Sequence, residues 1–146
     1  MHHASFVAGK GPHLPPARLV ELTPAAGLER WRRLLDERQP GAALLVLEEA
    51  GRLLGTAGAG PNRGDERVGE LYSLYVDSEH WGRGLGTRLH DAALEHLGRA
   101  GWSEVILWVL EGNTGARRFY ERLGWRCDGG MAEIWDAPTL RMRRAL

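Results

Sequence analysis

A glycine-rich turn at residues 81–86, Trp-Gly-Arg-Gly-Leu-Gly, constrains the fold of this chain more than any other segment. It separates a strand-like run at residues 70–76 from a helix-like run at residues 87–99. Its three glycines lack a Cβ, so a ligand can approach the backbone closely. The helix that follows offers unpaired N–H groups and the positive end of its dipole to an anion. A strand, a glycine turn and a helix start together predict a cradle for phosphate groups.

A second segment narrows that prediction. Residues 113–125, Asn-Thr-Gly-Ala-Arg-Arg-Phe-Tyr-Glu-Arg-Leu-Gly-Trp, follow a strand-like run at residues 103–109. They resemble the N-x-x-A-x-x-F-Y-x-x-x-G-[FW] segment of the GNAT N-acetyltransferases. In that family the segment follows a [QR]-x-x-G-x-[GA] pyrophosphate loop by about the separation seen here. The resemblance extends over residues 18–143 and departs from the family pattern at Trp81, where Gln or Arg is usual.

The resemblance implies an α/β GNAT acyl-CoA N-acyltransferase fold, which is a mixed, mostly antiparallel sheet flanked by helices. The spacing of apolar residues predicts elements in a matching order. The expected elements are a short strand at 17–22, a helix from Thr23 to Arg38, strands at 43–48 and 53–59, a strand at 70–76, a helix at 87–99, a strand at 103–109, a helix that stops at Gly124, and final strands from Trp125 and through 140–144.

The beginning of the chain is expected to be less regular. Residues 1–16 are rich in glycine and proline, which predicts an irregular leader before a single domain at residues 17–146. GNAT folds usually place two helices between the first strand and the following hairpin, but residues 24–41 have room for one. We therefore expect a shortened helical segment after the first strand. A shortened segment would leave the acceptor side open, or a partner chain would complete it. The predicted strand at residues 17–22 would lie at an edge of the sheet, where unpaired backbone groups invite a partner strand. Both points allow a homodimer.

Composition and charge exclude several classes of function. The formal net charge is zero, so the sequence indicates no broad basic surface for nucleic acid. No apolar run approaches the length of a membrane span, and the start lacks the apolar core of a signal peptide. The single cysteine, Cys127, cannot form an internal disulfide, which is typical of the reducing cytoplasm. The six histidines show no metal-binding spacing, so we expect no metal site.

The resemblance implies acetyl-CoA as the co-substrate and suggests its contacts. The backbone of residues 74–76 would pair with the pantetheine arm like an added strand, and the Val76 amide would polarise the thioester carbonyl. The amides of residues 83–87 would bind the pyrophosphate. Arg83 and Arg88 would add charge there, or would simply be solvated at a helix start. Asn113 would bond the pantetheine arm or cap its helix, two compatible roles. The expected cofactor-binding residues are Leu74, Tyr75, Val76, Arg83, Gly84, Leu85, Gly86, Thr87, Arg88, Asn113, Ala116 and Tyr120.

Acyl transfer from a thioester to an amine also needs an acid and a base. The resemblance places Tyr120 against the departing sulfur, where its phenol would protonate the thiolate, although it also lies on the apolar face of its helix. An alkylamine must lose a proton before it attacks. Glu70, at the start of the strand that leads to the glycine turn, could remove it directly or through a water, and Glu111 is an alternative. Tyr72, two residues from Glu70, could line the acceptor pocket.

Three hypotheses of function follow. The first is an N-acetyltransferase that moves an acetyl group from acetyl-CoA directly to a primary amine of a small molecule or a protein. The second is a non-catalytic acyl-CoA-binding module or sensor. The third is a nucleotide-binding interaction domain, which the glycine turn alone would permit, although its spacing matches neither the Rossmann fingerprint nor the P-loop. The first is favoured, because both sequence segments fit it.

Overall fold

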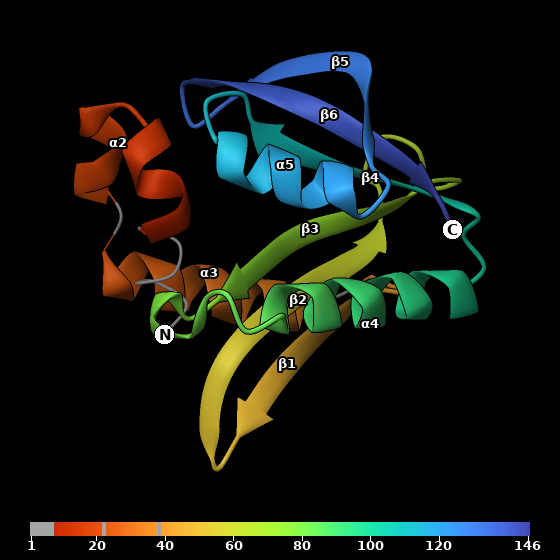
Figure 1. Ribbon diagram of the computed structural model, residues 1–146, viewed down its shortest axis with the longest axis horizontal. Coiled ribbons are helices and arrows are strands. Elements are labelled where there is room, and N and C mark those ends of the chain that lie inside the picture. Colours follow the sequence, from red (N-terminus) through yellow and green to blue (C-terminus); the bar gives the residue numbers. More distant parts are fainter. Residues whose placement is uncertain (1–7, 22, 38) are drawn as a thin grey trace.

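The computed structural model describes residues 8–21, 23–37 and 39–146, and within them a six-stranded sheet is flanked by helices (Figure 1). The strands are β1 (Ala43–Glu49), β2 (Arg52–Pro61), β3 (Gly69–Val76), β4 (Glu104–Leu110), β5 (Arg126–Ile134) and β6 (Ala137–Ala145). The helices are α2 (Pro16–Glu21), α3 (Pro24–Asp36), α4 (Leu85–Arg99) and α5 (Thr114–Arg122), with 3₁₀ turns η1 (Gly11–His13) and η2 (Ser78–His80).

The sheet has the order β1-β2-β3-β4-β6-β5 and is antiparallel except between β3 and β4. These two parallel strands are paired only at their beginnings, Gly69 with Val105 and Glu70 with Ile106. Beyond these pairs they diverge, so an opening lies between them toward the carboxyl end of β3. This arrangement confirms the predicted mixed, mostly antiparallel sheet.

One extra residue in β3 decides which side chains share a face. The register between β2 and β3 shifts within the pair, and Tyr72 is the additional residue of this β-bulge. Before the bulge Leu71 is part of the main core, and after it Leu74 and Val76 pack against that core. Tyr75 lies instead in a second cluster on the other face. The bulge therefore turns the aromatic ring of Tyr75 away from the core.

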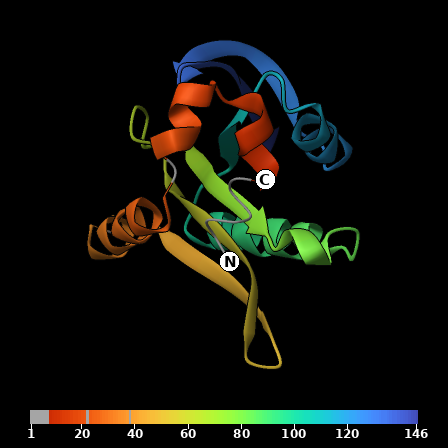
Figure 2. The same ribbon diagram turned by 90° about the vertical axis from the view of Figure 1, so that its left-hand side faces the viewer.

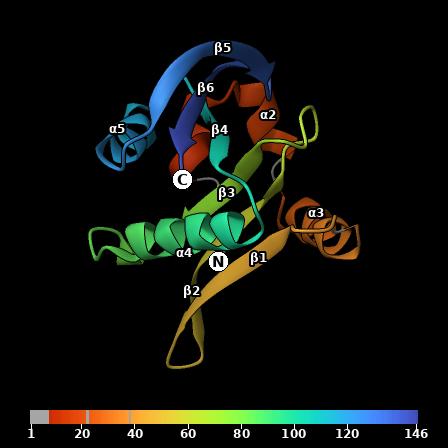
Figure 3. The ribbon, with the colours of Figure 1, turned by 90° about the vertical axis from the view of Figure 1, so that its right-hand side faces the viewer.

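Helices α4 and α5 cover the core face of the sheet. Figure 3 shows α4 lying across β1, β2 and β3, and α5 lying beside the strands of the other half. The α4 side chains that are buried recur at helical spacing: Leu85, Leu89, His90, Ala93, Leu94 and Leu97. Leucines, alanines and valines of the strands complete the core, and Trp125, three residues after the end of α5, is fully buried within it.

A buried hydrogen bond fixes the protonation of the one fully buried histidine among the described residues. Trp125 Nε1 lies 2.9 Å from His90 Nε2, and His90 Nδ1 lies 2.8 Å from Asp91 Oδ1. An indole N–H can only donate, so Nε2 must accept, and the proton of neutral His90 sits on Nδ1. Burial lowers the pKa of His90, and the bond to Asp91 opposes this only in part.

The prediction of a first strand at residues 17–22 is wrong. Residues 16–21 form helix α2 instead, and residue 22 lies outside the described residues. Pro16 suits the first turn of a helix, where its missing N–H has no intrahelical acceptor. The following helix was predicted correctly, because Thr23 caps α3 by accepting a bond from the amide of Ala26 at 3.1 Å and Pro24 occupies the first position. Its predicted end, residue 38, lies outside the described residues.

Two helices, α2 and α3, therefore precede the hairpin, and residues 24–41 contain one of them, as predicted. Among residues 8–21, 23–37 and 39–42 no strand precedes these two helices. The predicted irregular leader is corrected in part, since residues 8–13 contain a helical turn and η1, while residues 1–7 lie outside the described residues. Figures 1 and 2 place this first part of the chain, in red, where β3 ends and α5 begins.

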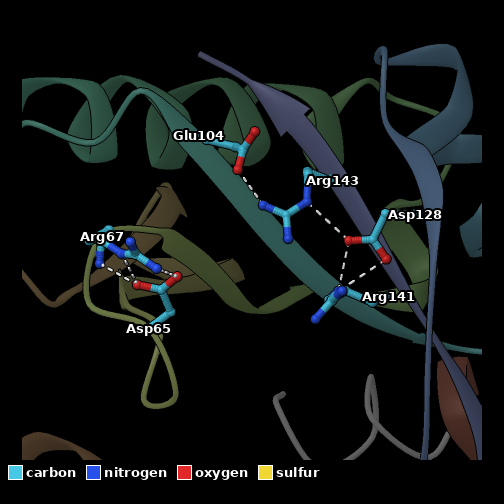
Figure 4. A network of polar contacts seen from close by, with 6 residues as sticks. All are labelled: Asp65, Arg67, Glu104, Asp128, Arg141 and Arg143. Carbon is cyan, nitrogen blue, oxygen red and sulfur yellow. Dashed lines mark hydrogen bonds and ion pairs between the residues drawn. The ribbon is translucent and has the colours of Figure 1, made fainter.

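Charged side chains join the last three strands on the face opposite the core. Asp128 of β5 accepts hydrogen bonds from Nε of Arg141, at 2.7 Å, and from Nε of Arg143, at 3.0 Å, both on β6 (Figure 4). Arg143 also pairs with Glu104 of β4. The guanidinium of Arg141 lies 5.8 Å from the centre of the Trp108 ring. This network holds Trp108 in place at the opening between β3 and β4.

Candidate active site

A cavity of about 680 Å³ occupies the opening between β3 and β4. It reaches from the glycine turn at the start of α4, along both strands, to the start of α5. It brings together ten of the twelve residues that the sequence predicted as cofactor contacts: Leu74, Tyr75, Val76, Gly84, Leu85, Gly86, Thr87, Asn113, Ala116 and Tyr120. Segments far apart in the sequence thus meet at one concave site.

The glycine turn forms an open cradle at the start of α4. Gly82 and Gly84 have φ values of 77° and 74°, a left-handed conformation that favours glycine, and Gly84 is the N-cap of α4. A Cβ added at Gly82 or Gly84 would meet nothing within 4 Å, so it would project into open space. No side chain caps this helix end, and its first N–H groups have no acceptor inside the helix. The cradle has room and donors for phosphate oxygens.

The two arginines predicted at the cradle lie outside the cavity lining. Arg83 is exposed, and its guanidinium pairs with Glu49 on β1 at 3.2 Å. Arg88 is exposed on α4 and is not among the residues that line the cavity. Trp81, which departs from the family pattern, does line it, and its Nε1 donates to the carbonyl oxygen of Val76 at 2.9 Å. The Trp81 indole therefore provides the hydrogen-bond donor for the last carbonyl group of β3.

The backbone of β3 presents donors to the opening. The amide of Asp77 bonds the carbonyl of Leu54 on β2 at 2.8 Å. Backbone groups alternate between the two edges of a strand, so the amides of Val76 and Leu74 face the other edge, where β4 has diverged. An extended ligand in the cavity could pair with this edge as a further strand would. This is the orientation that the predicted roles of Leu74 and Val76 require.

Helix α5 positions Tyr120 and Asn113 at the cavity. The Tyr120 ring packs edge-on against Phe119 and Trp125, with centroids 5.2 and 6.0 Å away. Burial, and to a smaller degree the nearby Tyr75, raises the pKa of Tyr120 well above its ordinary value, so the phenol stays protonated. Asn113 is the N-cap, and its Oδ1 accepts from the amide of Ala116 at 3.1 Å, which confirms the predicted cap.

A second cavity, of about 460 Å³, adjoins the first and contains Glu70. Tyr72, Ser73 and Trp108 line both cavities, so the two share a wall at the β-bulge. Burial raises the pKa of Glu70, against a hydrogen bond from Asn62 Nδ2 to Glu70 Oε2 at 2.8 Å. A carboxylate with a raised pKa beside a cavity is typical of a general base.

Tyr72 lines the second cavity together with Glu70. Its hydroxyl donates to the carbonyl of Pro61, and burial raises the pKa of Tyr72 to about 12. The alternative base, Glu111, is exposed after β4 and is not among the residues that line either cavity. Sequence reasoning missed Asn62, because its bond to Glu70 depends on how the loop after β2 folds.

One group of metal-ligand residue types lies at the edge of the first cavity. Side-chain atoms of Asp77, Glu79 and His80 lie within 4.8 Å of one another. Asp77 accepts from the amide of Glu79 at 3.3 Å and pairs with His80 at 3.3 Å, so these contacts also stabilise η2.

Among the described residues, no helix is long and apolar enough to cross a membrane.

Comparison with known proteins identifies the family. Residues 14–125 match the family model described as the acetyltransferase (GNAT) family, and the chain belongs to this family. The mycothiol acetyltransferase of Geodermatophilus obscurus is 47% identical over 64 residues, which is 44% of this chain and 21% of that relative. The chain thus spans about a fifth of this curated relative. The family assignment confirms the resemblance of the two sequence segments.

Two solved structures show the same fold. The ribosomal-protein-alanine N-acetyltransferase of Brucella melitensis is 25% identical, with a TM-score of 0.67 over 86% of this chain and 80% of that chain. The PaiA N-acetyltransferase of Thermoplasma acidophilum, solved in complex with coenzyme A, gives a TM-score of 0.74 at 15% identity. That match covers 99% of this chain and 87% of the other. The predicted fold class is confirmed.

Proposed function

We propose that this protein is an acetyl-CoA-dependent N-acetyltransferase that transfers the acetyl group directly to a primary amine. The observation that carries the proposal is the single cavity that joins the open helix-start cradle, the free edge of β3 and the phenol of Tyr120. The amides at the start of α4 would hold the pyrophosphate, and the free edge of β3 would hold the pantetheine arm. When bound, acetyl-CoA supplies an activated acyl group.

The residues around the two cavities divide the chemistry between them. The Val76 amide would donate to the carbonyl oxygen as negative charge develops there. Glu70 would take a proton from the amine, directly or through a water. The carbon–nitrogen bond forms while the carbon–sulfur bond breaks, and Tyr120 would give its proton to the leaving thiolate. Because the two cavities share the wall at Tyr72 and Trp108, donor and acceptor would meet without an enzyme-bound acyl group.

The acceptor is proposed only as a class. One relative is named mycothiol acetyltransferase and one structural neighbour is named ribosomal-protein-alanine N-acetyltransferase, which supports an amine of a small molecule or of a protein. The second cavity, with Glu70, Tyr72 and Trp108 on its walls, is where this amine would bind.

Binding and turnover test the proposal separately. Calorimetric titration with acetyl-CoA should show one-to-one binding at micromolar affinity. A thiol assay of released coenzyme A, run over a panel of primary amines and N-terminal peptides, should show transfer. Binding without any transfer would instead support the acyl-CoA sensor. Binding of ATP that competes with acetyl-CoA would support a nucleotide-binding domain.

Location and assembly are further proposals. The cytoplasm suits a chain with one cysteine, since its reducing conditions leave Cys127 as a thiol. A homodimer could form through β1, which is an edge strand and exposes Val46. Light scattering over a range of protein concentrations would decide this, and a constant monomer mass would rule the dimer out.

A further inference from the structure

The first cavity contains an amine that belongs to the chain itself. Lys10 is the only lysine in the sequence, and all other basic residues apart from the histidines are arginines. Its half-buried side chain lines the cavity between β3 and β4. Its Nζ lies 5.6 Å from the centre of the Tyr75 ring, within the range of a cation–π contact. The one side-chain amine of this protein thus lies at the site where we place acetyl transfer.

Two anchors hold the segment around Lys10 against the site. On one side, the carbonyl of Gly9 accepts a hydrogen bond from Asn113 Nδ2 at 3.2 Å. On the other side, Leu14 is buried in a cluster with Tyr75 and Leu110. Because both neighbours are tied to the cavity wall, Lys10 is held close to β3. Its approach costs less conformational entropy than that of an amine on an untethered chain.

Lys10 also approaches from the side that an acceptor requires. The cradle lies at the start of α4, on the face where Val76 packs against the core. The bulge at Tyr72 turns Tyr75 to the opposite face, and Lys10 lies over that ring. A donor held from the α4 face and the amine of Lys10 would therefore meet from opposite faces, at the opening between the strands. Direct transfer needs this arrangement of donor and amine.

We propose that Lys10 is an internal acetylation site, modified in cis by the chain's own active site; this rests on the proposed function. The neutral Nζ attacks the thioester carbonyl carbon, the carbon–nitrogen bond forms and the carbon–sulfur bond breaks. The proton lost by the nitrogen passes to solvent, and Tyr120 supplies the proton that makes the free thiol of coenzyme A. Arginine cannot replace lysine here, because its guanidinium keeps its proton in proteins.

Acetylation would change the cavity in a defined way. It removes the charge of Lys10 and with it the cation–π contact to Tyr75. The segment from Gly9 to Leu14 would then be held by its other contacts alone. The modified and unmodified chains should therefore differ in how the cavity receives an outside amine.

The test uses the full chain, acetyl-CoA and peptide mapping by mass spectrometry. Acetylation should appear at Lys10 at a rate that does not change with protein concentration, as expected for a reaction in cis. Variant Arg99→Lys provides the internal control, because it places a second lysine on the exposed far end of α4. Position 10 should be labelled at least about tenfold faster than position 99, since its effective concentration at the site is higher. Tyr120→Phe should slow the labelling of position 10 and not that of position 99.

A second readout needs no turnover. In the same Arg99→Lys chain, an amine-directed reagent such as an imidoester should modify both lysines, and coenzyme A should slow its reaction at position 10 alone. Lys10→Arg keeps the charge and serves as the folded control, which should bind acetyl-CoA and remain unlabelled.

Each other result overturns the proposal. Equal labelling at positions 10 and 99 would show a non-enzymatic reaction. A rate that rises with protein concentration would show transfer between molecules. If acetyl-CoA releases coenzyme A in the presence of outside amines while Lys10 stays unmodified, this inference is rejected and the proposed function stands. Absence of both acetyl-CoA binding and coenzyme A release would reject the two together.

Discussion

The cradle at the start of α4 can be tested with two substitutions at opposite ends of one helix. Gly84, at the N-terminus, has a φ of 74°, and Gly101, just beyond the C-terminus, has a φ of 108°. A Cβ at either position meets nothing within 4 Å. Valine at each site should thus cost about 1–2 kcal/mol or somewhat more in backbone strain, without a clash at its Cβ. For a chain of this size, that corresponds to a fall of roughly 2–8 °C in Tm.

Only one of the two variants should lose the cofactor. A side chain at Gly84 would stand where a phosphate oxygen approaches the first amides of α4, and a hydrogen bond to a charged group contributes about 1.5–3 kcal/mol. Loss of a single such bond weakens binding about 10- to 100-fold. Gly84→Val should therefore raise the Kd for acetyl-CoA by that factor in calorimetric titration, and Gly101→Val should leave it unchanged. An unchanged Kd in folded Gly84→Val would refute the cradle. An equal rise in both variants would show that helix stability, rather than the phosphate site, controls the affinity.

Three further predictions concern the proposed acid and base, Tyr120 and Glu70, and the buried histidine. Tyr120→Phe should lower kcat by about 10²-fold or more and leave the affinity for acetyl-CoA unchanged. A kcat equal to that of the unmodified protein would show that Tyr120 takes no part in the reaction. Glu70→Gln should lower kcat/KM about 10²- to 10⁴-fold. It should also abolish the decline of kcat/KM at acid pH, which we attribute to protonation of Glu70 at its raised pKa. If kcat/KM of the variant still declines at acid pH, another group is the general base. Because the pKa of His90 is lower in the folded than in the unfolded chain, the unfolded chain takes up the proton first. The free energy of unfolding should therefore hold above about pH 6.5 and decline as the pH falls below it. Urea titrations from pH 8 to 5 would measure this, and an equally steep decline in His90→Gln would contradict it.

The elements fixed by local chemistry could be predicted from the sequence. Thr23 caps α3, Asn113 caps α5, and glycines with positive φ stand at both ends of α4. Each depends on a residue and its immediate neighbours, so each leaves a pattern in the sequence. The family segment gave Asn113, Ala116 and Tyr120 of the first cavity, because its residues keep their spacing along α5.

The features that depend on distant pairing could not be predicted. The run at residues 17–22 alternates weakly, and a short apolar run suits a helix as well as a strand. The bulge at Tyr72 exists only because β2 pairs with β3 in a shifted register. Arg83 finds its partner at Glu49, 34 residues earlier in the chain, so a local view placed its charge at the phosphates instead.

The brief pairing between β3 and β4 has a consequence for how the molecule opens. The two halves of the sheet share only the pairs at Gly69 and Glu70, and each half carries its own helix (Figure 3). Such halves should behave as separate units in native-state hydrogen exchange, with the amides of Leu74 and Val76 exchanging faster than those bonded to β2. A ligand lying along this edge would protect both amides and hold the halves together, and the stability would rise with ligand concentration. Substrate would then serve as the missing strand that makes the domain a single cooperative unit.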